Sequence, residues 1–223
     1  MAHEVELKTC SRAALAGLLL LLAGTFSAAH AQSSVPVAGQ DYMEIPNGTP
    51  LQPADGKVVV EEFFNYICPA CNAFEPQFAA WRAQLPSYVQ LEYIPAAFRT
   101  DFVQYARAYY AAKLLGVAEK SHEAVYQAVH GTHTLPAEGD RPDEEKIAAF
   151  YAQFGVDAAE FLKTMRSFGV DVQIRRATEY LQRCRVPGTP AIVVNGRYLV
   201  MGATRTDMLR IASYLIGKEH QPG

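Results

Sequence analysis

Residues 58–71 read Val-Val-Val-Glu-Glu-Phe-Phe-Asn-Tyr-Ile-Cys-Pro-Ala-Cys, and the rest of the chain can be placed around them. The β-branched and aromatic first half of this segment is typical of a central strand that is covered on both faces. The next residues, 72–84, have the composition of a helix and carry Phe74 and Phe78 on one face. The two cysteines therefore lie at a junction between a strand and a helix.

This junction predicts redox chemistry for Cys68 and Cys71. Unpaired backbone N–H groups and the helix dipole favour negative charge at the N-terminus of a helix, and the thiolate is the reactive form of cysteine. Cys71 follows one turn later and can reach Cys68, so the pair can form and break a disulfide. The loop closed by such a bond is too short to stabilise a fold, which favours a catalytic disulfide over a structural one.

Residues 1–31 have the pattern of a cleaved secretory signal peptide. Lys8 and Arg12 precede an apolar run at 13–23, and Ala29-His30-Ala31 supplies a cleavage site. The run is shorter than the roughly 20 residues that span a bilayer, which favours cleavage after Ala31 over an uncleaved membrane anchor. Cys10 would leave with the signal. An exported protein meets an oxidising compartment in which disulfides persist, so a periplasmic location is expected.

Composition bounds the class of the mature chain. The whole sequence carries 20 Lys and Arg against 23 Asp and Glu, a formal net charge of −3, so no basic excess points to nucleic acid. Strand patterns recur at 89–94, 191–194 and 197–201, whereas residues 101–168 carry helix signals alone.

The order of these segments predicts an α/β fold with a mixed sheet flanked by helices. Residues 32–99 and 170–223 are expected to form one discontinuous domain, and residues 100–169 an inserted all-helical subdomain.

A second motif lies far downstream, where Gly188-Thr189-Pro190 precedes two short strands joined by Asn195-Gly196, a strong hairpin signal. A C-x-x-C motif at a strand–helix junction, followed by this Gly-Thr-Pro loop, resembles the thioredoxin superfamily. The segment from Glu62 to Glu75, the helical insertion and the secretory signal together resemble its DsbA-like branch, the periplasmic thiol:disulfide interchange proteins. The resemblance covers essentially all of the mature chain.

The resemblance assigns roles to four residues around the motif. It implies that Cys68 is the exposed nucleophile that forms a mixed disulfide with a substrate, and that Cys71 is the buried partner that closes the disulfide again. Glu62, six residues before Cys68, matches an acidic position beneath the family's active site that is thought to assist proton transfer. Glu75 matches a second acidic position near the site.

The resemblance also implies a substrate-binding surface beside the cysteines. It makes the bond before Pro190 cis and pairs the backbone of Thr189 with an extended substrate. Pro69 and Ala70, between the cysteines, are expected to contact the substrate. A proline offers no N–H, and a cis X-Pro bond exposes the polar groups of the preceding residue, so a peptide can add its backbone there.

The function implied is that of a thioredoxin-fold oxidoreductase that introduces disulfides into folding exported proteins. Its redox-active centre would be the Cys68–Cys71 disulfide, with no other cofactor, no metal and no nucleic acid. The family implies reoxidation by a membrane quinone-linked partner of the DsbB type, and we expect a monomer.

Ala70 keeps the direction of the reaction open. The family's oxidases usually carry histidine at this position, and without the imidazole the Cys68 thiolate is less stabilised, which makes the disulfide a weaker oxidant. A periplasmic disulfide reductase or isomerase of the same fold is therefore an alternative.

Two metal-based alternatives are weaker. A copper-binding chaperone would use both thiolates as soft ligands and would need a third ligand near them. A zinc site would need four ligands, and the sequence places none of the histidines of the mature chain in the strand–helix region. These histidines are His122, His130, His133 and His220.

Cys184 is a third cysteine of the mature chain, six residues before Pro190. We interpret it as a small buried hydrophobic residue. The alternative is a third redox residue that traps Cys68 or pairs with another chain.

Overall fold

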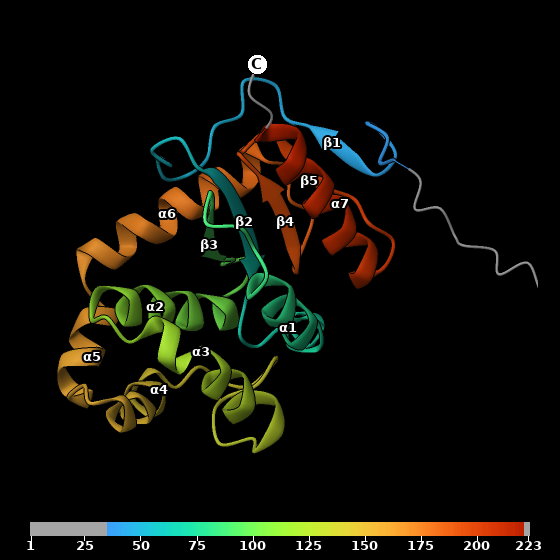
Figure 1. Ribbon diagram of the computed structural model, residues 1–223. Helices are drawn as coiled ribbons and strands as arrows, with labels where there is room; N and C mark the ends of the chain where they lie inside the picture. Colours follow the sequence, from blue (N-terminus) through green and yellow to red (C-terminus); the bar gives the residue numbers. More distant parts are fainter. Residues whose placement is uncertain (1–34, 221–223) are drawn as a thin grey trace, which may run out of the picture. The chain divides into compact units, whose positions relative to one another are not determined.

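Five strands form one mixed sheet in the order β1-β5-β4-β2-β3 (Figure 1). The computed structural model describes residues 35–220, so the predicted signal peptide at residues 1–31 lies outside the described residues. The strands are β1 (Tyr42–Glu44), β2 (Val58–Phe64), β3 (Val89–Pro95), β4 (Ala191–Val194) and β5 (Tyr198–Val200). This topology confirms the expected α/β class.

Strand β2 occupies the centre of the sheet. It pairs in parallel with β3 and antiparallel with β4, and all seven of its side chains are buried. The central strand predicted from its continuous apolar character is therefore confirmed. Because β2 and β3 run in parallel, the loops that follow them, including the cysteine motif after β2, emerge at the same end of the sheet.

The hairpin between β4 and β5 follows the Asn-Gly signal. Asn195 and Gly196 have φ values of 51° and 64°, the left-handed pair that a tight two-residue hairpin requires. The Asn195 side chain accepts a hydrogen bond from the backbone N–H of Val59 at 2.7 Å, which fixes the turn against β2. A side chain at position 196 would lie 2.2 Å from the Thr49 backbone, so only glycine fits there.

Helices cover the sheet and fill the region between β3 and β4. They are α1 (Pro69–Arg82), α2 (Thr100–Leu114), α3 (Ala118–Tyr126), α4 (Glu144–Phe150), α5 (Ala158–Met165), α6 (Phe168–Arg183) and α7 (Arg205–Glu219), with a π-helical turn η1 (Gln127–Gly131) and a 3-10 turn η2 (Tyr151–Phe154). Among residues 35–220, none of these helices is both long and apolar enough to cross a membrane.

The sheet separates two hydrophobic clusters. On one face, Phe74 and Phe78 of α1 and Ile211 and Leu215 of α7 pack with Val60 of β2. The other cluster contains side chains of α2, α3, α4, α5 and α6, so the helices that follow β3 share one core with the sheet. The domain boundaries expected at 99/100 and 169/170 stay predictions.

Candidate active site

Cys68 lies at the start of α1 and caps it. Its backbone is extended, and its sulfur accepts a hydrogen bond from the backbone N–H of Cys71 at 3.4 Å. The helix begins at Pro69 rather than at Asn72, where sequence composition put its start, because proline suits the first helical position. The helix thus includes Cys71 and places it one turn beyond the cap.

The loop between β2 and α1 is held by Asn65. Its side-chain amide donates to the carbonyl oxygens of Ala96 at 2.7 Å and Phe102 at 3.1 Å, and its oxygen accepts from the N–H of Ile67 at 3.2 Å. These three bonds tie the cysteine loop to the segment after β3. The helix N-terminus, and with it Cys68, is therefore fixed relative to the sheet.

The two thiols differ in environment. Cys68 is 7% exposed and Cys71 only 1%, so the accessible sulfur of the pair is that of Cys68, although most of it is covered. A hydrogen bond from the Cys71 thiol lowers the pKa of Cys68 to about 6, against the effect of burial, and the Thr189 side chain and nearby N–H groups contribute. Burial, and the neighbouring Cys68, raise the pKa of Cys71. Cys68 is thus the thiolate and Cys71 the protonated partner.

The Gly-Thr-Pro loop faces this pair. The Sγ atom of Cys68 lies 3.4 Å from the carbonyl oxygen of Thr189, and the Thr189–Pro190 bond is cis. Beside it is a groove of about 400 Å³ whose lining is largely apolar. It is formed by residues 187–191 and 199–202 together with Met208. An accessible thiolate, a loop backbone and an apolar groove thus meet in one place.

Glu62 and Glu75 both lie in the interior. Glu62 is 1% exposed, and neither of its carboxyl oxygens has a hydrogen-bond partner among the described residues. Burial, and the neighbouring Glu75, raise the pKa of Glu62 well above its ordinary value, which favours the protonated acid. Glu62 alternates with Glu61 along β2, so the two carboxyl groups point to opposite faces of the sheet.

Sequence reasoning did not assign a role to Glu61. Its carboxyl group accepts hydrogen bonds from the N–H of Leu51, at 2.7 Å, and from the hydroxyl of Tyr180. Burial raises its pKa to about 7. Glu61 therefore connects the loop before β2 and helix α6 to the central strand, through contacts that no local pattern predicts.

The prediction that no histidine lies near the β2–α1 region was wrong. The Nδ1 atom of His122, on α3, lies 2.9 Å from the Tyr66 hydroxyl, and its Nε2 atom lies 3.5 Å from a carboxyl oxygen of Glu75. His130 donates from Nε2 to the backbone carbonyl of Tyr66 at 2.7 Å. Both histidines therefore contact a residue two positions before Cys68. The tyrosine at position 66 offered the only local signal, since a buried hydroxyl needs a partner.

A sequence model of the family described as "DSBA-like thioredoxin domain" matches residues 59–212, which include the cysteine motif and the Thr189–Pro190 loop. The chain belongs to this DsbA-like family. Its activity is accordingly that of a thiol:disulfide oxidoreductase, in agreement with a thiolate–thiol pair at a helix N-terminus.

Relatives and solved structures agree with this assignment. The thiol:disulfide interchange protein DsbA of Pseudomonas aeruginosa is 35% identical over 205 residues, 90% of this chain and 93% of that protein. The corresponding protein of Azotobacter vinelandii is 33% identical over 211 residues, 93% of this chain and 95% of the relative. The crystal structure of the oxidoreductase DsbA from Xylella fastidiosa superposes with a TM-score of 0.79 at 41% identity, covering 83% of this chain and 98% of that one.

Cys184, the third cysteine among the described residues, lies away from solvent. It is 1% exposed and is a free thiol, as are Cys68 and Cys71. Burial raises its pKa to about 11, so its thiol stays protonated and unreactive at neutral pH. This environment agrees with the interpretation of Cys184 as a small buried residue.

Residues 35–220 contain no side-chain group that would serve the zinc or copper alternatives. No group of three or more histidine, cysteine or acidic side chains in this part of the chain is placed to hold a metal ion. His130 and His133, which share a helical spacing, instead each bond to a backbone carbonyl, of Tyr66 and Val129.

Proposed function

We propose that this protein donates its Cys68–Cys71 disulfide to exported proteins as they fold in the periplasm. The observation that carries the proposal is the asymmetry of the two sulfurs. One is an accessible thiolate with a low pKa, and the other is a buried thiol. A stabilised Cys68 thiolate lowers the free energy of the reduced, dithiol form. The Cys68–Cys71 disulfide is then readily transferred to a substrate.

The exchange has two steps. A substrate thiolate attacks the Cys68 sulfur, the bond between Cys68 and Cys71 breaks, and its electron pair leaves on Cys71, which takes up a proton. A second substrate thiolate then attacks the substrate sulfur of the mixed disulfide and releases the Cys68 thiolate. Two substrate thiols are oxidised to one disulfide, and the cysteine pair is reduced. The redox-active pair is the only cofactor that this cycle needs.

The substrate would bind beside the cis-proline loop. We assign Thr189 to backbone pairing with an extended segment, and Pro69, Ala70 and Pro190 to contact with it. The exposed positions of Pro69 and Ala70 at the start of α1 and the apolar groove next to Thr189 support this assignment. Loose apolar complementarity suits an enzyme that acts on many unfolded chains.

The proposed cycle requires a partner that reoxidises the cysteine pair. We assign this role to a membrane quinone-linked protein of the DsbB type and expect the protein to act as a monomer after removal of residues 1–31. Glu62 and Glu75 would assist the transfer of protons to and from Cys71, because their carboxyl groups are the acidic groups buried beneath it.

A reductase of the same fold is the second candidate, favoured by Ala70 between the cysteines. The deciding experiment starts from the purified mature protein in its disulfide form. It should oxidise a reduced unfolded peptide with two cysteines within seconds, and its reduction potential, from equilibration with glutathione, should be well above that of thioredoxin. A potential near roughly −270 mV, the thioredoxin range, would assign it as a reductase.

A further inference from the structure

The interior beneath the cysteines holds an unusual number of unpaired polar groups. Of the seven buried side-chain nitrogen and oxygen atoms in the described residues that lack a hydrogen-bond partner, five belong to Glu62, Glu75, His122 and Tyr126. These residues come from β2, α1 and α3, and the charges of Cys71, Glu62 and Glu75 all act on the Tyr126 hydroxyl. Buried polar groups are normally paired, so a cluster without partners points to water or to proton transfer.

His122 occupies the edge of this cluster and has a defined orientation. The hydroxyl of Tyr66 lies 2.9 Å from Nδ1. Burial raises the pKa of Tyr66 well above its ordinary value, so the phenol keeps its proton and can donate it to Nδ1. The Nε2 atom then carries the mobile proton and points at Glu75, whose carboxyl oxygen is 3.5 Å away. That separation is slightly long for a direct hydrogen bond and closes with a small movement of either group.

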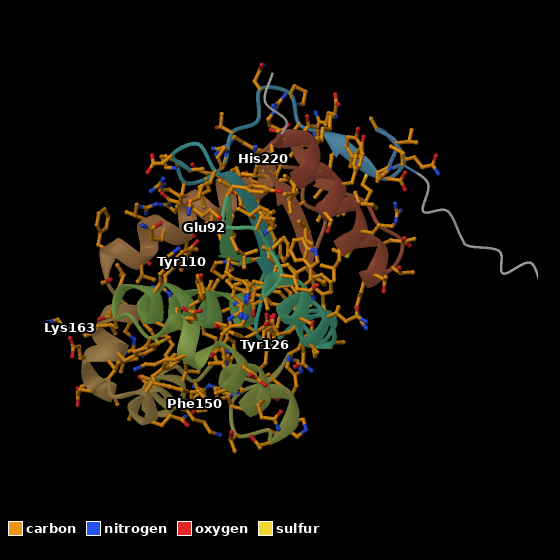
Figure 2. The ribbon with its side chains drawn as sticks, in the orientation of Figure 1. Glu92, Tyr110, Tyr126, Phe150, Lys163 and His220 are labelled. Atoms are coloured by element: carbon orange, nitrogen blue, oxygen red, sulfur yellow. The ribbon has the colours of Figure 1, made fainter. Side chains whose placement is uncertain are left out.

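The other side of His122 faces a groove that opens between α1, β3, α2 and α3. The groove has a volume of about 610 Å³, and His122 lines it together with Arg82, Tyr93 and Glu119. His122 itself is 5% exposed. Figure 2 labels Tyr126, from the same helix, where α1 meets α3. An imidazole thus separates the buried carboxyl groups from a space large enough to hold water.

We propose that His122 carries protons between this groove and the Glu62–Glu75 pair, and that this path serves Cys71. The inference rests on the proposed function, in which Cys71 gains a proton each time its disulfide is reduced. Cys71 is 1% exposed and cannot exchange that proton with bulk water directly. An imidazole suits the outlet because its protonation changes between about pH 5 and 8.

The transfer balances at each step. The Cys71 thiolate takes the proton of the Glu62 acid and leaves a carboxylate. Glu62 recovers a proton through Glu75 from the imidazolium of His122, and the neutral imidazole takes a proton from water in the groove. Reoxidation runs the same steps in reverse. His122 does not contact a reacting sulfur, so it is a positioning and relay residue rather than a catalytic one.

The ionisable groups around His122 come from every element packed on it. They are Glu75 and Arg82 of α1, Glu92 and Tyr93 of β3, Tyr109 and Lys113 of α2, Tyr66 of the cysteine loop, and Glu119 and Tyr126 of α3. The pH dependence of the relay therefore belongs to this group of side chains and not to His122 alone.

The test compares His122→Gln with the unaltered protein in single-turnover reduction by dithiothreitol and in reoxidation by oxidised glutathione. Glutamine keeps the polar contacts but cannot carry a proton. Both rates should fall by about tenfold or more at neutral pH, and the shape of the pH–rate profile should differ between the two proteins. Because a relay acts on rates alone, the equilibrium constant with glutathione should change little. His220→Gln, at the opposite end of the domain from Tyr126 in Figure 2, is the matched control.

Two further variants keep the proposal open to refutation. Tyr66→Phe removes the hydroxyl that orients His122 but keeps the ring, and should slow both directions less than His122→Gln does. In His122→Ala, added imidazole should restore the rate, because the groove can admit it. Unaltered rates and pH profile in His122→Gln and Tyr66→Phe, or a change in equilibrium with no change in rate, would overturn the relay. Failure of the unaltered protein to oxidise the peptide would instead contradict the proposed function.

Discussion

The Sγ atom of Cys68 lies 3.4 Å from the carbonyl oxygen of Thr189, a residue 121 positions later in the chain. The contact joins the N-terminus of α1 to the loop before β4, and it places the reactive sulfur against the backbone that would receive a substrate. The environment of the Cys68 sulfur is therefore formed by two segments that lie far apart in the sequence.

Replacing Thr189 by valine should raise the pKa of Cys68 from about 6 toward its ordinary value, because the Thr189 side chain is one of the groups that lower it. The ultraviolet absorbance of the thiolate, followed during a pH titration of the dithiol form, measures the change. Thr206→Val, an exposed position near the start of α7, is the control and should leave the titration unchanged. An unaltered titration in Thr189→Val would show that the backbone N–H groups and Cys71 alone lower the pKa of Cys68.

The stability of the dithiol form should rise with pH between about 6 and 9. In this window the unfolded chain keeps the proton of Cys68, whose ordinary pKa is 9.0, while the folded protein has lost it, so the unfolded state binds more protons. The gain is lost as pH falls through about 6. Thermal unfolding of the dithiol and disulfide forms over this range checks the sign. A constant difference in Tm between the two forms would contradict it.

Replacing Cys71 by serine should trap substrates. The mixed disulfide on Cys68 would then lack the buried thiol that resolves it, so covalent complexes should accumulate and disappear on reduction. Non-reducing gel electrophoresis detects them after the variant is mixed with an unfolded protein whose single cysteine is activated as a mixed disulfide with glutathione, because the Cys68 thiolate attacks the protein sulfur and glutathione leaves. Cys184→Ser is the control, because its thiol is buried away from the exchange; complexes formed equally by this variant would refute the assigned roles.

Introducing histidine at Ala70 should make the protein more oxidising. The position is exposed at the start of α1, so an imidazole fits there and can stabilise the neighbouring Cys68 thiolate. A tenfold change in the equilibrium with glutathione corresponds to about 30 mV, and we expect a rise of at least this size. Ala70→Gln separates charge from bulk and should shift the potential much less. A potential unchanged by histidine would mean that Ala70 does not limit the oxidant strength.

Glu62→Gln should stabilise the protein and slow the exchange. The pKa of Glu62 is raised well above 4.5, so above that pH the folded state holds a proton that the unfolded state has lost, and stability falls as pH rises. Glutamine removes this cost, so the variant should be more stable at pH 7, and the difference should vanish below about pH 4.5. Urea unfolding at several pH values measures it.

The neighbouring carboxyl group gives the matched comparison. Glu61→Gln should destabilise the protein by about 1–3 kcal/mol, because an amide nitrogen cannot accept the hydrogen bonds that Leu51 and Tyr180 donate to the two carboxyl oxygens. Equal effects of the two substitutions would contradict the different environments of the two faces of β2.

The sequence predicted the elements whose signals are local. The central strand at 58–64 and the hairpin at Asn195-Gly196 have short-range causes, a β-branched run and a left-handed pair. The helix after Cys68 was predicted from its composition, but its start at Pro69 was missed. The meeting of Cys68 with the Gly-Thr-Pro loop came from resemblance, because no periodicity carries a contact across 121 positions.

The parts that sequence reasoning missed depend on packing between elements. His122 reaches the site because α3 lies against α1, and Glu61 reaches Tyr180 because α6 packs on the sheet, where the Tyr180 ring stacks on Phe63. Both residues look like ordinary helix or strand positions in the sequence, and only the folded chain gives them partners.

Tyr66 binds the helical segment at residues 118–131 at two points, His122 through its hydroxyl and His130 through its carbonyl. Transplanting the Cys-Pro-Ala-Cys loop onto a smaller scaffold that lacks these helices would remove the partners of the Tyr66 hydroxyl and carbonyl. Each of these groups that stayed buried without a partner would lower the stability of the graft by about 1–3 kcal/mol. The cysteine loop and the 122–130 segment therefore form one structural unit. A graft that carries the loop without this segment should be less stable and poorly ordered.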